Sequence, residues 1–245
     1  MNLNITYLYY DILNLYGDRG NIIILKRRAE ARGINVNVNY TTIGEELAVK
    51  ETDILFMGGG EDRSQEAVEM DIRKKSTIIR EIVESNRVVI AICGSYQLLG
   101  NYYITVGGKE IRGLGILDVY TTPAEKRMIG NIITKSTIKG KETEIVGFEN
   151  HRGMTFIGSK TKPFGRVIVG YGNNGRDKTE GAVYKNCYGT YLHGPLLSKN
   201  PVLADMLIEK ALSTKYEREI ILNPIDDSSE LRAKNYISTL IKSKG

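Results

Sequence analysis

The stretch "VVIAICGSYQLLG" (residues 88–100) of this 245-residue chain predicts a strand that passes directly into a helix. Its first five residues are apolar and mostly β-branched, which predicts a buried strand over 88–92, and the Gly-Ser pair after Cys93 predicts a helix that begins at Gly94. A buried strand that turns directly into a helix is typical of a parallel α/β sheet. We therefore expect Cys93 at the carboxyl edge of that sheet, where open α/β folds bind ligands.

The first hundred residues repeat this alternation of strand and helix. Apolar runs, alternating or continuous, predict strands over 3–9, 34–40 and 53–60, and helical spacing of apolar residues predicts helices over 20–33 and 62–86. Strands that alternate with helices form parallel sheets with crossovers of fixed hand. The sequence therefore predicts an α/β fold with a mainly parallel central sheet flanked by helices.

The pattern changes over residues 105–190. Short β-rich runs separated by Gly and Asn turns predict antiparallel strands added to the edge or top of the parallel sheet. Asn200 and Pro201 then form a typical N-cap and first-turn pair, which predicts a helix from 201. No repeat or linker interrupts the chain, so we expect a single domain over 1–245.

Composition excludes several classes of protein. Hydrophobic residues make up 41% and charged residues 26% of the chain, as in globular proteins. The net charge of +5 is scattered among acidic residues without a basic stripe, so nucleic-acid binding is disfavoured. No apolar run approaches the ~20 residues of a membrane span, and the N-terminus lacks the basic segment of a signal peptide. We expect a cytoplasmic protein with no membrane span.

Cys93 has two interpretations on this stretch alone. A thiol at a helix N-terminus has a lowered pKa because the helix dipole favours the thiolate, but a buried, unreactive cysteine also fits the pattern. A nucleophilic thiol needs a base, and the chain has two histidines. His193 ends a predicted strand before Gly194, as expected of a site residue, whereas His151 fits better as a polar residue in a turn. Cys187, inside a predicted strand, is interpreted as structural.

Three glycines, Gly58, Gly59 and Gly60, follow the predicted strand that begins at 53. Backbone N–H groups at such a strand end can point at a developing oxyanion, while a plain tight turn is the other interpretation. These three residues alone do not distinguish an oxyanion site from a plain turn.

Three motifs resemble the class I glutamine amidotransferases in their cobyric acid synthase-like branch. They are "CGSYQ" (93–97), "GFENH" (147–151) and "HGP" (193–195), where the branch has CGGYQ, GYEIH and HGP. The resemblance implies a flavodoxin-like domain whose motif-bearing core covers about 5–212, followed by a helical extension over 213–245.

Further stretches resemble the GatD family of glutaminase subunits more narrowly. These are "LNLYGDRGN" (13–21), "GGGEDRSQ" (58–65), "KRMIGN" (126–131), "GNNGRDKTEG" (172–181) and "GTYLHGPLL" (189–197). Members of that family work with the Mur ligase-like protein MurT on the cell-wall precursor lipid II. The resemblance implies that this chain hydrolyses L-glutamine and supplies ammonia for amidation of the glutamate of lipid II to isoglutamine.

The resemblance also implies the catalytic residues. Cys93 is the expected nucleophile for the side-chain amide of glutamine, and His193 is the base that activates the thiol and later protonates the leaving ammonia. The backbone N–H of Gly94, with that of Gly59 or Gly60, is the expected oxyanion hole.

Two further residues are implied to bind substrate. Gln97 is expected to help hold the glutamine, and Arg127 matches a family arginine whose guanidinium suits an α-carboxylate. A solvated surface arginine is the other interpretation of Arg127. Ser95 departs from the branch, which usually has glycine there, without removing a catalytic group.

Pro195 departs from the broader class in a way that affects the chemistry. Class I enzymes usually have a glutamate two residues after the histidine, so no residue in the sequence can be assigned to orient His193. Glu149, another acid or a second protein are the open alternatives. A partner-supplied carboxylate predicts weak glutaminase activity for the chain alone.

A synthetase partner is also implied, because the chain has no GxxxxGK[ST] phosphate loop. We expect no cofactor and no metal in this chain, with ATP and Mg²⁺ on a MurT-type ligase subunit that presents the lipid-linked precursor. The alternatives are a glutaminase for a cobyric acid-type or other amide synthetase, a glutaminase of vitamin-cofactor synthesis, and a non-catalytic homologue. Intact Cys93 and His193 argue against the last, and Pro195 against the vitamin-cofactor enzyme.

Overall fold

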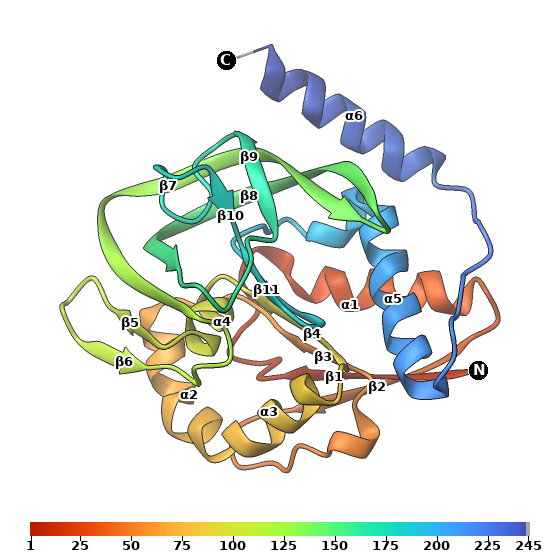
Figure 1. The fold of residues 1–245 in the computed structure, drawn as a ribbon, viewed down its shortest axis with the longest axis horizontal. Helices are drawn as coiled ribbons and strands as arrows, with labels where there is room; N and C mark the ends of the chain where they lie inside the picture. The colour runs from red at the N-terminus through yellow and green to blue at the C-terminus, as the bar shows by residue number, and fades with distance from the viewer. Residues whose placement is uncertain (244–245) are drawn as a thin grey trace.

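The computed structural model describes residues 1–243, which form two sheets with helices around them (Figure 1). The first sheet has the strand order β11-β12-β4-β3-β1-β2. Its strands are β1 (Asn2–Leu8), β2 (Asn35–Thr41), β3 (Ile54–Met57), β4 (Val88–Ile92), β11 (Ala182–Tyr184) and β12 (Cys187–Thr190). Each neighbouring pair is parallel except β11 with β12.

The five parallel strands have the order β2-β1-β3-β4-β12, which is that of a flavodoxin-like sheet. The predicted α/β fold with a mainly parallel sheet is confirmed. In Figure 1, α1 (Arg19–Glu30) and α5 (Pro201–Tyr216) lie on one side of this sheet, and α2 (Asp62–Lys74) and α3 (Ser76–Glu84) on the other. The short helix α4 (Gly94–Leu99) begins at the residue that the sequence predicts.

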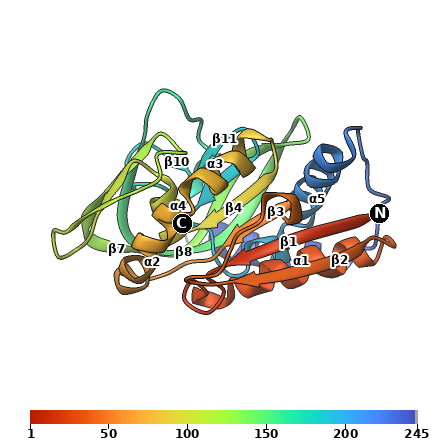
Figure 2. The same cartoon turned by 90° about the horizontal axis from the view of Figure 1, so that it is seen from below.

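The second sheet is dominated by one long hairpin. Strands β7 (Val119–Ile138) and β8 (Lys141–Ile157) pair antiparallel around a turn at Lys139 and Gly140, both of which have positive φ. The remaining strands are β5 (Tyr102–Ile104), β6 (Glu110–Arg112), β9 (Gly165–Val169) and β10 (Thr179–Glu180). Figure 2 shows β7 and β8 at the end of the molecule away from β1 and β2.

The placement of the antiparallel strands differs from the expectation in one respect. Only β11 extends the parallel sheet, and the others build a sheet of their own. The physical reason is that the 20 residues of β7 and the 17 of β8 satisfy their backbone groups mainly against each other. The register of this pair shifts between Pro123 and Met128, where the strand bulges.

The two sheets meet at His193. The backbone N–H of His193 donates to the carbonyl oxygen of Phe148 at 2.8 Å, and the N–H of Phe148 donates back to the carbonyl oxygen of His193 at 3.2 Å. Phe148 lies in β8, and His193 follows β12. The long hairpin is therefore fixed directly to the backbone of a predicted catalytic residue.

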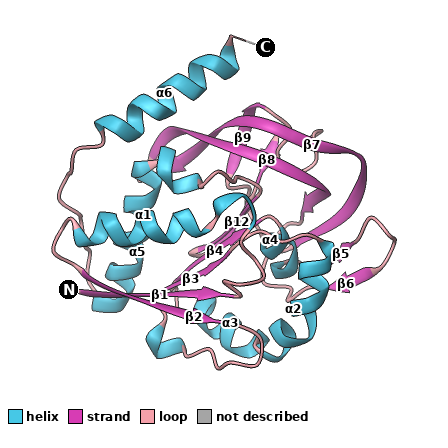
Figure 3. Cartoon of the chain, turned by 180° about the vertical axis from the view of Figure 1, so that it is seen from behind, coloured by secondary structure: helices cyan, strands magenta, loops and turns pink. Residues whose placement is uncertain are grey.

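The last described helix, α6 (Ser228–Lys242), lies along the second sheet (Figure 3). Its residues Ile237 and Ile241 pack with Ile133, Val146 and Val169 of that sheet. The expected boundary of a C-terminal extension at 213 falls inside α5, which continues to Tyr216. Short 3₁₀ turns occur at Leu15–Gly17, Val49–Glu51 and Leu196–Lys199. No helix among residues 1–243 is long and apolar enough to cross a membrane.

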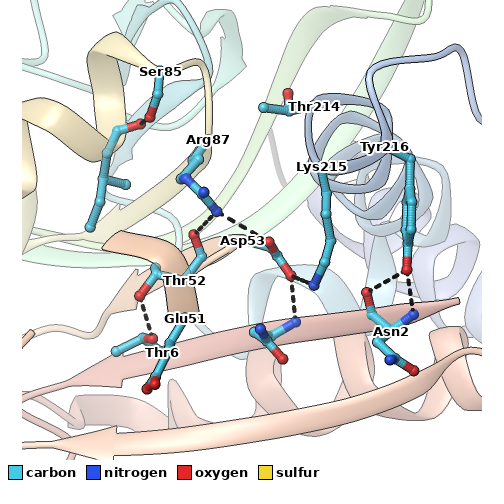
Figure 4. Close-up of polar contacts among 12 residues, drawn as sticks. Asn2, Thr6, Glu51, Thr52, Asp53, Ser85, Arg87, Thr214, Lys215 and Tyr216 are labelled. Carbon is cyan, nitrogen blue, oxygen red and sulfur yellow. Dashed lines mark hydrogen bonds and ion pairs between the residues drawn. The ribbon is translucent and has the colours of Figure 1, made fainter. Parts of the chain in front are cut away.

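Ionic contacts surround Asp53 at the amino end of the parallel strands of the first sheet (Figure 4). This buried carboxylate accepts hydrogen bonds from the N–H of Asn4 at 2.7 Å, from Lys215 at 2.7 Å and from Arg87 at 3.2 Å. These contacts tie β1 and α5 to the start of β3. The Asp53 carboxylate is thus paired within the fold at the amino end of the strands. The candidate site lies at their carboxyl end.

Candidate active site

Cys93 occupies the sharp turn between β4 and α4. Its backbone has φ 52° and ψ −105°, outside the regions that residues with a Cβ ordinarily adopt. The turn leaves no room at the next position: a Cβ on Gly94 would lie 2.6 Å from Nε2 of Gln65 and 2.7 Å from the carbonyl oxygen of Gly60. The geometry is that of a nucleophile held by a strained strand-to-helix turn, with its side chain at the carboxyl edge of the sheet.

His193 reaches the same edge from the neighbouring strand. It follows β12, which pairs with β4, and its side chain is fully buried. Gly59 shows how closely the groups converge: a Cβ there would lie 2.7 Å from Cε1 of His193, 3.1 Å from Oδ2 of Asp18 and 3.5 Å from Cβ of Cys93. The two predicted catalytic residues are therefore brought together around a position that only glycine can fill.

Asp18 places a carboxylate against His193 that the sequence analysis did not predict. Its Oδ1 lies 3.2 Å from Nδ1 of His193, and its Oδ2 accepts a hydrogen bond from the N–H of Gly59 at 2.7 Å. Both Asp18 and His193 are fully buried. The motif "LNLYGDRGN" contains this residue, but nothing local in the sequence shows that the loop after β1 turns toward the residue after β12.

The charge on His193 follows from its neighbours. Burial lowers the pKa of this imidazole, but hydrogen bonding and the negative charges of Asp18 and Cys93 outweigh it and raise the pKa of His193 to about 10. Because the pKa is raised in the folded state, this pairing stabilises the fold fully below about pH 6.5, and the stabilisation is lost as the pH rises toward about 10. At neutral pH the site therefore favours the imidazolium form of His193.

A cavity of about 410 Å³ opens at Cys93. It is lined by the ends of β3 and β4, by the start of α2 and by the β7–β8 hairpin. The lining includes Tyr16, Gly60, Asp62, Gln65, Cys93, Gln97, Arg127, Asn150 and His151. A volume of this size holds a small polar molecule.

Comparison with known proteins identifies the family of this chain. Residues 4–201 match the family model of the CobB/CobQ-like glutamine amidotransferase domain. The chain belongs to this family. Its amidotransferase fold is also found in PurLQS from Thermotoga maritima, with a TM-score of 0.59 at 14% identity over 89% of this chain and 99% of that one. A second structure, titled a glutamine amidotransferase, gives a TM-score of 0.50 at 16% identity over 84% and 98% of the two chains.

Two relatives within the amidotransferase family are similar over nearly their full length. The chain is 45% identical to the GatD subunit of lipid II isoglutaminyl synthase from Staphylococcus aureus, over 96% of this chain and 94% of that protein. It is 42% identical to the same subunit from Streptococcus pneumoniae, over 92% and 86%. The similarity to the cobyric acid synthase of Clostridium acetobutylicum is 28%, over 65% of this chain and 32% of that protein. The predicted GatD resemblance is confirmed.

Among the expected oxyanion-hole donors, the N–H of Gly59 is already occupied. Gly59 cannot offer its N–H to an oxyanion in this structure, because that N–H donates to Asp18. The N–H groups of Gly60 and Gly94 have no hydrogen-bond acceptor within the described part of the chain. Of the three expected donors, these two are free to bind a developing negative charge.

Glu149, one alternative for orienting His193, has a different role. Its two carboxylate oxygens accept hydrogen bonds from the N–H groups of Tyr171 at 2.7 Å and Gly172 at 2.8 Å. The histidine near it is His151, with Nε2 3.9 Å from Oε2 of Glu149. Glu149 therefore fixes the turn after β9 and is not the acid of the site.

Gln97 and Arg127 both line the cavity, in different ways. The side-chain oxygen of Gln97 accepts from Nε2 of Gln65 at 2.9 Å, and its side-chain nitrogen donates to the hydroxyl of Tyr191 at 3.0 Å, so this amide is already held within the protein. Arg127 lies exposed in the bulge of β7, where Nη1 donates to Oδ1 of Asn150 at 2.8 Å. Arg127 keeps further donors for a ligand.

The remaining histidine and cysteine do not join the catalytic group. His151 is buried, with Nδ1 2.8 Å from the carbonyl oxygen of Gly153 and its ring stacked on Tyr191 at 3.7 Å between centroids. It lies within β8, not in the turn expected from the sequence, and forms part of the cavity wall. Cys187 lies within β12, and burial raises the pKa of its thiol far above the usual value. A thiol in that environment is unreactive at neutral pH.

Glu180 is a second buried acid that the sequence reasoning missed. It is fully buried at the end of β10, and Oε1 accepts from the hydroxyl of Thr190 and the N–H of Tyr191, both at 2.8 Å. Burial raises the pKa of Glu180 to about 7. The carboxyl group holds the backbone between β12 and His193.

The raised pKa of Glu180 predicts a pH-dependent stability. The folded chain binds this proton between the ordinary pKa of 4.5 and about 7, so the free energy of unfolding falls as the pH rises through that window, by about 3 kcal/mol. Glu180→Gln keeps an acceptor and removes the titration, so its stability should lack this fall. Urea unfolding at pH 5 and pH 8 measures the difference. Exposed Glu46→Gln is the matched control, and an unchanged pH slope in Glu180→Gln would contradict the assignment.

Proposed function

We propose that this chain is the glutaminase subunit of a lipid II isoglutaminyl synthase. The observation that carries the proposal is the convergence of Cys93, His193 and Asp18 around Gly59, with Cys93 lining the cavity. The identity to two GatD subunits over most of the chain supports the same activity.

Hydrolysis of glutamine would proceed through a thioester. The Cys93 thiolate attacks the carbonyl carbon of the side-chain amide, and the N–H groups of Gly60 and Gly94 bind the oxyanion that forms. Nε2 of His193, which is buried and has no hydrogen-bond partner within residues 1–243, protonates the leaving nitrogen as the C–N bond breaks. His193 then takes a proton from water, which attacks the thioester and releases glutamate and free Cys93.

Asp18 fixes the proton on the other imidazole nitrogen. By accepting from Nδ1, the carboxylate keeps Nε2 facing the thiol and stabilises the imidazolium between the two half-reactions. This role lies within the chain, so no carboxylate from a partner is needed to orient His193. We nevertheless propose a partner for the acceptor reaction: a MurT-type ligase subunit with ATP and Mg²⁺, which presents lipid II and uses the ammonia.

Arg127 is proposed to bind the α-carboxylate of glutamine. Loss of a charge-assisted hydrogen bond costs about 1.5–3 kcal/mol, so Arg127→Ala should raise KM for glutamine by about 10- to 100-fold with a smaller change in kcat. Steady-state ammonia release gives both constants. Arg112→Ala, an exposed arginine on β6, is the control. A wild-type KM in Arg127→Ala would show that Arg127 is a solvated surface residue that does not bind glutamine.

The proposed acceptor reaction is tested by nitrogen transfer. The chain, a MurT-type ligase subunit, lipid II, ATP and Mg²⁺ are mixed with glutamine labelled with ¹⁵N in the side-chain amide. We expect mass spectrometry to show ¹⁵N in the amide of isoglutamine, and omission of the chain to abolish transfer from glutamine. Glutamine hydrolysis without any transfer to lipid II would refute the acceptor and leave the glutaminase in place.

A further inference from the structure

Tyr16 stands at the mouth of the cavity and has no part in the chemistry described above. It lies in the 3₁₀ turn Leu15–Gly17 with φ 51° and ψ 29°, the left-handed region that a residue with a Cβ rarely adopts. The following Gly17 also has positive φ, of 77°. A strained backbone persists only where surrounding contacts hold it, and strain of this kind gathers at functional sites.

The aromatic ring of Tyr16 packs against the catalytic base. Its centroid lies 5.0 Å from that of His193, edge to face at 76°, and 6.2 Å from that of Phe148. The imidazole of His193 is fully buried, whereas Tyr16 is 43% exposed. Tyr16 therefore forms the outer layer over His193, on the same short segment that carries Asp18.

The hydroxyl of Tyr16 is tied to the proposed carboxylate-binding residue. It accepts a hydrogen bond from Nδ2 of Asn150 at 2.6 Å, and Oδ1 of Asn150 accepts one from Arg127 at 2.8 Å. Asn150 lies in β8 and pairs with Ile129, just after the bulge of β7 that carries Arg127. The side-chain amide of Asn150 thus links the guanidinium of Arg127 to Tyr16, whose ring covers His193.

We propose that Tyr16 and Asn150 are positioning residues that couple occupation of Arg127 by the substrate carboxylate to closure of Tyr16 over His193. Neither residue takes part in the chemical steps, so each acts only through the residues that it contacts. A carboxylate on the outer donors of Arg127 holds the guanidinium against Asn150, and Asn150 in turn holds the Tyr16 hydroxyl. Glutamine, which carries the α-carboxylate, stabilises the closed arrangement, whereas a reagent without a carboxylate gains nothing from it. This inference rests on the proposed glutaminase activity and deepens it into a basis for substrate discrimination.

Tyr16→Phe tests the coupling because it keeps the ring and removes only the hydroxyl. We expect kcat/KM for glutamine to fall about 10-fold, as for one lost hydrogen bond, and alkylation of Cys93 by a glutamine-like diazo ketone to slow by the same factor. Alkylation of Cys93 by iodoacetamide, which has no carboxylate, should not slow. Asn150→Ala also releases Arg127, so it should slow both carboxylate-bearing substrates at least as much as Tyr16→Phe does. The double variant should be no worse than Asn150→Ala alone, because the hydrogen bond to Tyr16 is already lost in that variant.

Tyr10→Phe is the matched control, since Tyr10 is 39% exposed on the same loop and does not line the cavity. Equal slowing of both reagents in Tyr16→Phe, additive losses in the double variant, or wild-type values throughout would each overturn the coupling. These outcomes differ from failure of the proposed function, in which the wild-type chain would not hydrolyse glutamine at all.

Discussion

Replacing Asp18 by asparagine should lower kcat for glutamine hydrolysis by about 10³- to 10⁴-fold, the loss seen when the orienting acid of a Ser-His-Asp triad is changed to its amide. Asparagine fills the same volume but can present an N–H to Nδ1 of His193, which favours the wrong tautomer and leaves the imidazolium without its counter-charge. Ammonia release by the purified chain, compared with wild type at saturating glutamine, measures the loss.

The control for Asp18→Asn is Asp11→Asn, on the same loop, where the carboxylate accepts from the hydroxyl of Thr42 at 2.6 Å away from His193. Its turnover should be that of the wild type. If Asp18→Asn kept full turnover, His193 would be oriented by something other than this chain's Asp18. A partner-supplied carboxylate, the expectation from Pro195 alone, would then return as the explanation.

Replacing Cys93 by alanine should abolish glutamine-dependent activity altogether, because no other thiol reaches the cavity. In the assembled synthase, added ammonium chloride should restore amidation of the acceptor, since the ligase reaction needs ammonia and not the thiol. Cys187→Ala should retain glutamine hydrolysis. Mass spectrometry after treatment with a glutamine-like diazo ketone should show one adduct, on Cys93.

Two results would count against this assignment of Cys93. An adduct on Cys187 alone would contradict the burial that raises the pKa of its thiol. Glutamine-dependent amidation that persisted in Cys93→Ala would require another nucleophile. Failure of ammonium to rescue the variant would instead show damage to the complex, which gel filtration of the two subunits separates from loss of chemistry.

The sequence was sufficient to predict the parallel sheet and the elbow at Cys93. Both depend on local pattern: a continuous apolar run predicts β4, and glycine directly after Cys93 predicts the sharp start of α4. The position of His193 beyond the end of a strand was also predicted, because Gly194 and Pro195 mark a loop there.

Asp18 and Glu180 were missed because their roles depend on which loops meet. Asp18 lies 175 positions from His193, and local pattern carries no information on that contact. With Pro195 after the histidine, the sequence left Glu149, another acid or a partner as alternatives, and the carboxylate that contacts His193 belongs to Asp18 in the loop after β1. The choice between the N–H groups of Gly59 and Gly60 was left open for the same reason, since the contact of Gly59 with Asp18 cannot be predicted from local sequence. The sequence likewise predicted several short β-rich runs where the structure has one continuous β7–β8 hairpin.

The backbone contact between Phe148 and His193 can form only late in synthesis, after His193 has left the ribosome. Asp18, Gly59 and Cys93 leave the ribosome well before His193, and the β4–β12 pairing joins segments nearly a hundred residues apart. Contacts this distant close late, because loop closure costs entropy before pairing repays it. A nascent or truncated chain therefore holds a thiol without its base, and glutaminase activity appears only when folding of the whole chain is complete.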